Sequence, residues 1–330
     1  MLTYGLFLNM GSNLGANTEE VFQLTREQAE LAETLGYHDL WVTEHHCIPF
    51  GINPSAITAS AFLLGATTRI RVGTAVTLSP LHHPLELAER ASLLDQFSHG
   101  RFDLGIGRGG YLKDYELFDV DTSRWDREPV HSAQTMVDIW RDHDLSAQSP
   151  QSGQSQFQPE PYTKPHPPLF LATGSEEGVS FAAEHGFPLQ HYFSTEAASR
   201  VKIEARYREM NSAPVEHIHT LILALGANEE RLRESLTKSL TDSFKSGDWP
   251  AVPQAVPRHT DGNGQQLDRA DMAKRVAERA IVGPLESVRD QLDQFVETTG
   301  AARLVLYMEA IAEPSITRQS IVSFAEAFIQ

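Results

Sequence analysis

Three consecutive side chains, Glu44-His45-His46, are well suited to acid–base chemistry. His45 can act as an acid, a base or a hydrogen-bond donor near neutral pH, and the Glu44 carboxylate can orient a ring or bind part of a ligand. The paired histidines also suggest a metal, but adjacent side chains splay apart and no further ligand cluster stands out, so we expect none. For His46, a loop role that only bonds backbone groups remains an alternative.

A glycine-rich turn, Gly105-Ile106-Gly107-Arg108-Gly109-Gly110, matches the pattern of dinucleotide-binding loops literally. Such loops normally open a helix at a βαβ crossover, whereas three strand–helix units precede this turn and Tyr111–Glu116 shows no clear helical pattern. Arg108 is the informative residue, because a guanidinium can clamp a phosphate bidentately while the glycines allow close approach. The turn therefore favours phosphate binding over a dinucleotide fingerprint.

A second anion site is indicated at Thr173-Gly174-Ser175-Glu176-Glu177-Gly178, which opens a predicted helix. Free backbone N–H groups at a helix N-terminus bind anions well. Ser175 could equally be a plain helix cap, which is a common role for serine. Taken together with Arg108, a phosphate site is the better interpretation.

Short apolar runs that alternate with amphipathic stretches must position these residues. The runs predict eight strands, at Tyr4–Leu8, His38–Thr43, Ile70–Val76, Arg101–Ile106, Leu169–Ala172, Pro188–Phe193, His217–Ala224 and Ala302–Met308. Helices are predicted from near Thr18 to Gly36, after Asn53-Pro54, from Pro84, and over Val130–Arg141, Glu176–His185 and Ser315–Phe328. Eight strand–helix units indicate an α/β fold, a single (β/α)8 TIM barrel domain over residues 1–330, whose strand C-termini build the active site.

Two segments interrupt the alternation of strands and helices. Ser146–Pro168, before the fifth strand, is rich in Gln, Ser and Pro, and Phe244–Leu267, between the seventh and eighth strands, has few apolar residues. Loops this long in a compact domain are usually lids, binding loops or disordered segments. The second is placed to cover the mouth of the barrel, and a disordered surface loop is the alternative.

Composition excludes several classes of protein. A net charge of −17 argues against nucleic acid and anionic membranes as partners. Cys47 is the only cysteine, so the chain has no internal disulfide framework. The N-terminus reads as a buried strand rather than a signal peptide, and no apolar run approaches the ~20 residues that span a bilayer, so we expect a cytoplasmic protein.

Several stretches, taken in order, resemble the bacterial luciferase-like flavin-dependent monooxygenases, most nearly the luciferase α subunit. They are Glu44-His45-His46, Gly73-Thr74-Ala75, Leu93–Phe102, Gly105–Gly109, Pro168–Gly186, Val282-Gly283-Pro284 and the final strand and helix. The resemblance spans nearly the whole chain, and a run of matched segments in order is more specific than any single motif.

The resemblance implies that reduced FMN binds at the strand C-termini. Arg108 would grip the FMN phosphate with help from Ser175, and more loosely from Gly174 and Gly178. His45 would be the catalytic base. The remaining cofactor-binding residues implied are Glu44 in the flavin pocket, a cis peptide at Ala75-Val76 beneath the flavin ring, and Tyr111 near the phosphate and ribose.

The implied reaction is a two-component monooxygenation. A separate NAD(P)H:flavin reductase would supply reduced FMN, which would react with O2 to give a C4a-hydroperoxide that oxygenates an aldehyde or a secondary metabolite. A homodimer is also expected. One alternative is an oxidoreductase using the deazaflavin F420 on the same barrel. Another is a non-catalytic flavin-binding subunit, which in this family lacks the arginine that matches Arg108.

Some positions depart from the family pattern. Gly107 stands where the α subunit has a reactive cysteine. We expect the loss of that side chain to enlarge the space over the flavin ring. Gly174 replaces an acidic residue and Gly178 a hydroxyl residue, so phosphate contacts there would rely more on backbone N–H groups. The residues expected to line the substrate pocket also differ in character from those of the family. They are Gln190, His191, Tyr192 and Tyr307.

Overall fold

Parallel strand pairing organises the chain into a barrel. The computed structural model describes residues 2–143, 156–245 and 268–329. The strands are β1 (Thr3–Leu8), β2 (Asp39–Val42), β3 (Arg71–Thr74), β4 (Thr77–Leu78), β5 (Phe102–Gly107), β6 (Leu169–Ala172), β7 (Gln190–His191), β8 (Ile218–Leu225), β9 (Ile281–Gly283) and β10 (Arg303–Tyr307). The longer helices are α1 (Thr18–Leu35), α2 (Ala56–Ala66), α3 (Pro84–Ser98), α4 (Leu112–Leu117), α5 (Arg124–Asp142), α6 (Glu176–His185), α7 (Ala197–Met210), α8 (Glu229–Lys245), α9 (Arg269–Glu278), α10 (Leu285–Thr299) and α11 (Pro314–Phe328).

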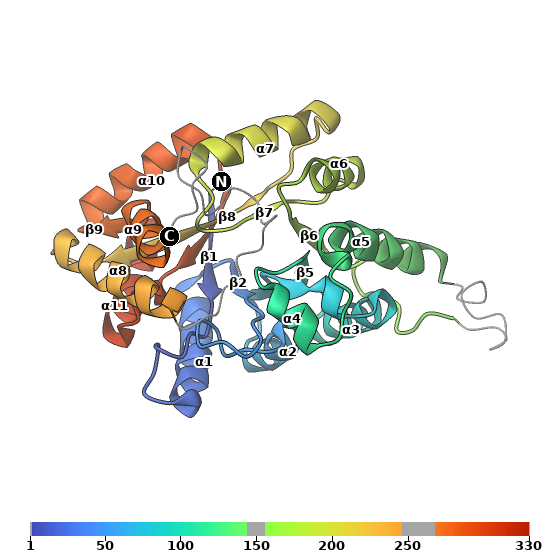
Figure 1. Cartoon of the computed structure of the whole chain (residues 1–330), viewed down its shortest axis with the longest axis horizontal. Coiled ribbons are helices and arrows are strands. Elements are labelled where there is room, and N and C mark those ends of the chain that lie inside the picture. The colour runs from blue at the N-terminus through green and yellow to red at the C-terminus, as the bar shows by residue number, and fades with distance from the viewer. Residues whose placement is uncertain (1, 144–155, 246–267, 330) are drawn as a thin grey trace.

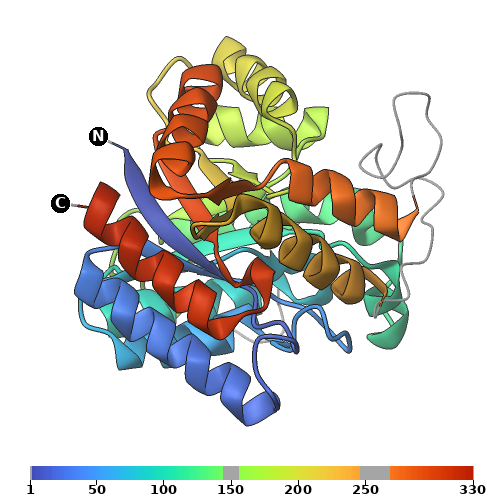
Figure 2. The ribbon, with the colours of Figure 1, turned by 90° about the vertical axis from the view of Figure 1, so that its left-hand side faces the viewer.

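The sheet runs in the order β5-β3-β2-β1-β10-β8-β7, and β6 pairs with the free edge of β5. A parallel bridge between Leu171 and Leu189 joins β6 to the residue before β7, so that pairing runs around the full circle. The helices lie outside the strands (Figures 1 and 2), and α11 packs beside α1. This arrangement confirms the expected TIM barrel.

Alternating side chains fill the barrel interior and the layer beneath the helices. At the amino-terminal end of the barrel, Arg303 forms an ion pair with Asp39 at 2.7 Å, while Arg71 pairs with Asp103. In the next layer Trp41 packs edge-on against Phe170, with ring centroids 5.0 Å apart. Side chains fill both of these layers. Within the barrel, a binding site can therefore form only at the carboxyl ends of the strands.

Several sequence expectations need correction. The third strand is split into β3 and β4 around residues 75–76, and the sixth strand has shrunk to the two residues of β7. Helix α5 begins at Arg124 rather than Val130, because Pro129 lies inside the helix instead of opening it. Helix α4 forms where no helical pattern was apparent, and β9 is an additional strand paired with β8.

Each of the two expected excursions includes residues outside the described part of the chain. Of Ser146–Pro168 only residues 156–168 are described, and of Phe244–Leu267 only residues 244–245. The lid expected at the barrel mouth therefore stays a prediction. Among the described helices, none is both long and apolar enough to cross a membrane.

Candidate functional site

The loops that carry the predicted site residues meet at the carboxyl end of the barrel. Residues 44–46 follow β2, residues 75–76 lie between β3 and β4, and Arg108 and Ser175 follow β5 and β6. β4 pairs with β5, and β5 with β6, so that Leu78 and Ala172 flank Gly107 on its two sides. The structure thus brings together the segments that sequence reasoning selected separately.

Glu44 holds three of these segments in place. Its carboxylate is buried and accepts the backbone N–H of Ala56, at the start of α2, at 3.0 Å, and that of Leu78, in β4, at 3.1 Å. The Nε2 atoms of His82 and His46 lie 3.3 and 3.6 Å from the same carboxylate. Every one of these contacts is to the protein itself, which makes Glu44 a positioning residue of the loop cluster.

Electrostatics keep Glu44 ionised. Burial raises the pKa of a carboxyl group, but here the side chains of His46 and His82 and the Ala56 N–H outweigh burial and lower the pKa of Glu44 to about 2. Sequence reasoning missed His82, which follows the third strand in Leu81-His82-His83. Its sequence position would have pointed to this loop cluster, but its contact with Glu44 depends on the fold.

His45 lies partly buried in an aromatic setting. Its ring centroid is 5.1 Å from that of Phe50 and 6.1 Å from that of Tyr111. Gly51 approaches the ring so closely that a Cβ atom there would overlap His45 Cδ2. Burial lowers the pKa of His45 to about 4, although the neighbouring Glu44 charge acts in the opposite direction. The imidazole is therefore neutral at pH 7 and able to accept a proton.

Asp114 is a second buried carboxyl group that sequence reasoning missed. It lies on α4 and is 1% exposed. Burial raises its pKa to about 6, against the opposing charges of His46 and Lys113. The sequence did not point to Asp114, because Tyr111–Glu116 shows no clear helical pattern and helix α4 was not predicted there.

The peptide bond between Ala75 and Val76 is cis, as the resemblance implied. Thr74, just before it, donates its hydroxyl to the Gly105 carbonyl at 2.7 Å and accepts the Gly105 N–H at 2.9 Å. The Thr74 carbonyl accepts Nε2 of Gln190 at 3.1 Å. A Cβ atom at Gly105 would overlap that carbonyl, so glycine allows the two strands to approach here.

Gly107 is closely packed on the side where a side chain would stand. A Cβ atom built on Gly107 would lie 2.8 Å from Cγ2 of Val76 and 3.2 Å from Cβ of Ala172. The side of Gly107 to which a Cβ would point is therefore closely packed, and the larger space expected over the flavin ring stays a prediction. The room left by the missing cysteine side chain is filled from across the strand pair.

Arg108 and Tyr111 follow the glycine turn. The Arg108 guanidinium lies over the Trp125 ring, 5.0 Å from its centroid, and the Arg108 carbonyl accepts the Tyr115 hydroxyl at 3.1 Å. Tyr111 is buried with Lys113 Nζ 5.9 Å from its ring. These contacts fix Arg108 on α5 and place Tyr111 beside His45.

At the start of α6, Ser175 caps the helix. Its hydroxyl accepts the Gly178 N–H at 3.1 Å and lies 3.2 Å from the Thr173 hydroxyl. A Cβ atom at Gly178 would overlap Oγ1 of Thr173, which accounts for glycine there. The alternative prediction, that Ser175 caps the helix, is therefore confirmed, and its phosphate contact stays a prediction. The cap leaves Ser175 exposed at the N-terminus of α6, where an anion could still reach it.

A cleft of about 530 Å³ joins α5 to α6, which lie side by side (Figure 1). Its lining includes two arginines at the beginning of α5 and an acidic residue at the beginning of α6. The lining residues are Ser123, Arg124, Arg127, Val130, His131, Gln134, Glu177 and Phe181. Sequence reasoning missed Arg124 and Arg127 because it began α5 at Val130.

The expected substrate-pocket residues separate into two groups. Gln190 points into the barrel toward Thr74, and the buried Tyr307 ring lies 5.1 Å from Phe7 and 5.3 Å from Phe193. His191 instead points outward, with Nε2 3.0 Å from Glu204 on α7. Its assignment to the substrate pocket is wrong, because successive side chains of a strand face opposite sides.

The sequence of this chain matches a family model and several known proteins. A family model described as luciferase-like monooxygenase matches residues 2–303. The oxygenase component of flavin-dependent trigonelline monooxygenase from Acinetobacter baylyi is 28% identical over 196 residues, 57% of this chain and 54% of that protein. This chain thus spans about half of that relative. The alkanal monooxygenase alpha chain of Photobacterium leiognathi is 28% identical, with 94% of both chains covered.

Solved structures share the fold. A monooxygenase from Streptomyces bottropensis superposes with a TM-score of 0.82 at 22% identity, covering 99% of both chains. The oxygenating constituent of 3,6-diketocamphane monooxygenase from Pseudomonas putida, in complex with FMN, gives 0.76 at 18% identity over 98% of this chain and 97% of that one. An F420-dependent secondary alcohol dehydrogenase gives 0.75 at 16% identity, covering 99% and 98%.

Proposed function

This chain belongs to the luciferase-like monooxygenase family, and we propose that it is the oxygenase component of a two-component, FMN-dependent monooxygenase. A separate NAD(P)H:flavin reductase would supply the reduced flavin. The organic substrate would be an aldehyde or a secondary metabolite. The chain would act as an enzyme rather than as a non-catalytic flavin-binding subunit, because Arg108 is present.

The observation that supports the proposal is that Arg108, Arg124 and Ser175 lie on β5, α5 and α6 or the loops between them, which pack beside one another. Arg108 lies on Trp125 of α5, Arg124 lines the cleft between α5 and α6, and Ser175 caps α6. Guanidinium groups beside a helix N-terminus suit a phosphate monoester, the group that distinguishes FMN from riboflavin. This donor set suits FMN, and Arg108, Arg124 and the N-terminus of α6 would hold its phosphate.

The chemical end of the site would lie around His45. Reduced FMN would supply the electrons for O2 activation. His45, neutral at pH 7, would accept or return a proton at a ring nitrogen, and Glu44 would hold its loop against β4 and α2. The apolar rings of Phe7, Phe193 and Tyr307 would keep water from the reacting groups.

Anaerobic titration with each reduced cofactor tests the proposal. We expect saturable binding of reduced FMN, weaker binding of reduced riboflavin, and none of reduced F420. Oxygen consumption with reduced FMN should then depend on substrate across a panel of aldehydes and aromatic metabolites, scored by a product mass increased by one oxygen atom. Preferential binding of F420 would favour the deazaflavin alternative, and FMN binding without substrate-dependent oxygenation would favour the non-catalytic subunit.

A further inference from the structure

Three buried side chains converge between the barrel and α7, outside the site described above. His191 on β7 and His219 on β8 are register partners in the parallel ladder, and both point away from the barrel toward Glu204 on α7. Their exposed fractions are 3%, 1% and 4% for His191, His219 and Glu204. His219 lies near the amino-terminal end of β8, and the cluster lies on the side of the β7–β8 pair that faces α7.

One carboxylate oxygen faces both rings. Oε1 of Glu204 lies 3.0 Å from Nε2 of His191 and 3.1 Å from Nε2 of His219, and the three atoms all lie within 4.8 Å of one another. Ligands at about 2.1 Å from one tetrahedral ion are roughly 3.4 Å apart, close to these spacings. Nε2 of His191 and Oε1 of Glu204 are nonetheless buried without a well-directed hydrogen bond. The two atoms therefore have each other as their nearest polar contact, and a cation between them would satisfy both.

Two arginines lie near the cluster, and neither occupies the side of Glu204 that faces the histidines. Arg208 lies 3.5 Å from the other carboxylate oxygen, Oε2. The buried Arg200 is turned to backbone carbonyls, to which it donates hydrogen bonds, at Tyr192, Thr195 and Thr220. Oε1 is thus the oxygen that faces the two histidines.

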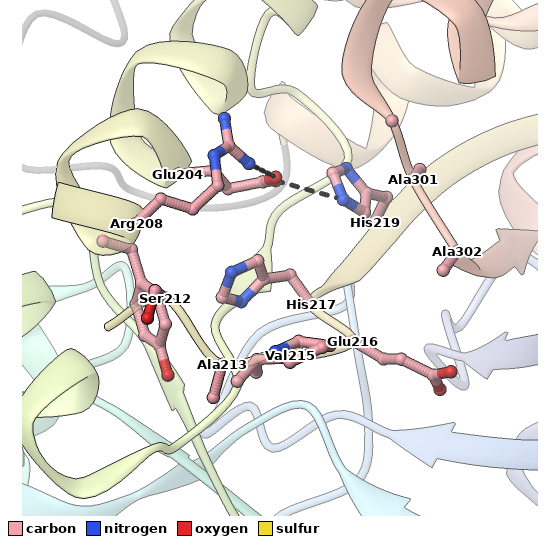
Figure 3. A pocket seen from close by; sticks show the side chains of 13 residues that line it. Glu204, Arg208, Ser212, Ala213, Val215, Glu216, His217, His219, Ala301 and Ala302 are labelled. Carbon is pink, nitrogen blue, oxygen red and sulfur yellow. Dashed lines mark hydrogen bonds and ion pairs between the residues drawn. The ribbon is translucent and has the colours of Figure 1, made fainter. Parts of the chain in front are cut away.

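A cavity of about 360 Å³ gives access to the cluster. Figure 3 shows Glu204 and His219 pointing toward one another at its wall, with His217 and Arg208 nearby. His217 is engaged differently, since its Nδ1 accepts the Leu189 N–H at 3.0 Å. Glu204 and His219 thus lie at the wall of this cavity, whereas His191 does not line it.

We propose that His191 Nε2, His219 Nε2 and Glu204 Oε1 bind a divalent transition-metal ion of the zinc class. Two imidazoles and one carboxylate are ligands that Zn²⁺ accepts, and the remaining position would hold a water molecule in the cavity. The ion would tie α7 to the β7–β8 pair. It would lie apart from the flavin chemistry proposed above and would not depend on it.

Zinc binding to the full chain, prepared without a histidine tag and stripped with a chelator, tests the proposal. We expect calorimetric titration with Zn²⁺ to give one equivalent per chain and to raise Tm. Co²⁺ in the same site should give the intense visible absorption of a tetrahedral complex. Absence of stoichiometric Zn²⁺ binding and of that absorption in the wild-type chain would overturn the assignment.

Matched variants locate the ion. Glu204→Gln and His219→Asn should each lower Zn²⁺ affinity at least tenfold and abolish the rise in Tm. His217→Asn is the control, because asparagine can still accept the Leu189 N–H while its side chain lines the same cavity; it should bind Zn²⁺ as the wild type does. Circular dichroism establishes that each variant is folded. Zinc binding that is unchanged in both ligand variants would place the ion elsewhere and refute the site.

Discussion

A Cβ atom at Gly107 would lie 2.8 Å from Cγ2 of Val76, so Val76 already occupies the place that a side chain at residue 107 would take. The two residues come from neighbouring strand segments, since Val76 precedes β4 and Gly107 ends β5. The glycine and the valine are thus a complementary pair. A cysteine at residue 107 would need a smaller residue at 76.

This relationship predicts a rescue. Gly107→Ala should lower the free energy of unfolding by about 1–3 kcal/mol, because the added methyl group overpacks against Val76 and Ala172. Val76→Ala in the same chain should recover part of that loss, and a double-mutant cycle by urea unfolding measures the coupling. Strictly additive effects of the two substitutions would show that the pair is not complementary.

Arg108 should contribute to flavin affinity through the FMN phosphate and very little through the flavin ring. Arg108→Ala should weaken FMN binding by about 10- to 100-fold, since a charge-assisted interaction is lost, and leave riboflavin binding within a factor of about two. Anaerobic fluorescence titration with both flavins measures this selectivity. Arg26→Ala, on the outer face of α1 where Arg26 pairs with Glu30, is the matched control. Equal losses for FMN and riboflavin would argue against a phosphate role.

His45 should act in turnover rather than in binding. His45→Ala should retain flavin affinity and lower turnover by about 10²- to 10⁴-fold, the usual contribution of general acid–base catalysis. Because burial lowers the pKa of His45 to about 4, the imidazole is a base throughout the neutral range, and the wild-type rate should decline only as the pH falls toward that value. Steady-state oxygen consumption measures both effects. Unchanged turnover in the variant would remove His45 from the mechanism.

The sequence predicts the barrel and the loops of its site, but not the partners of each side chain. Eight apolar runs locate the strands well because a buried parallel strand is apolar almost throughout. Helix α4 spans only six residues and offers too short a period to detect. The contact of His82 with Glu44 depends on how two loops pack. By contrast, the outward direction of His191 could have been foreseen, since Gln190 and His191 are adjacent in one strand and cannot both face the barrel.

Glu309 should make stability fall as the pH rises from about 4.5 to about 7. Its Oε2 accepts the N–H groups of Asn9 at 2.8 Å and Met10 at 3.1 Å, and burial raises the pKa of Glu309 to about 7 against these bonds and one from Gln28. A carboxyl group whose pKa is raised on folding stabilises the chain below its unfolded pKa, and this contribution is lost as pH rises through 7. Glu309→Gln should therefore gain roughly 1–3 kcal/mol over the wild type between pH 5 and pH 8.

Urea unfolding at the two pH values measures that difference. The shifted histidines are present in both chains, so their effect on stability cancels in the comparison. A difference between Glu309→Gln and the wild type that stays the same at pH 5 and pH 8 would mean that Glu309 does not titrate in this range.

Two glycines allow a matched test of the strand packing beneath the site. Gly105→Ala should cost at least about 3 kcal/mol, because its Cβ would overlap the Thr74 carbonyl, which is backbone and cannot rotate away. Gly65→Ala is the control: Gly65 lies in α2, has no atom within 4 Å of an added Cβ, and should gain about 1 kcal/mol from the higher helix propensity of alanine. Urea unfolding compares the two variants. If both changed stability in the same direction, the close approach of Thr74 to Gly105 could not be what requires glycine there.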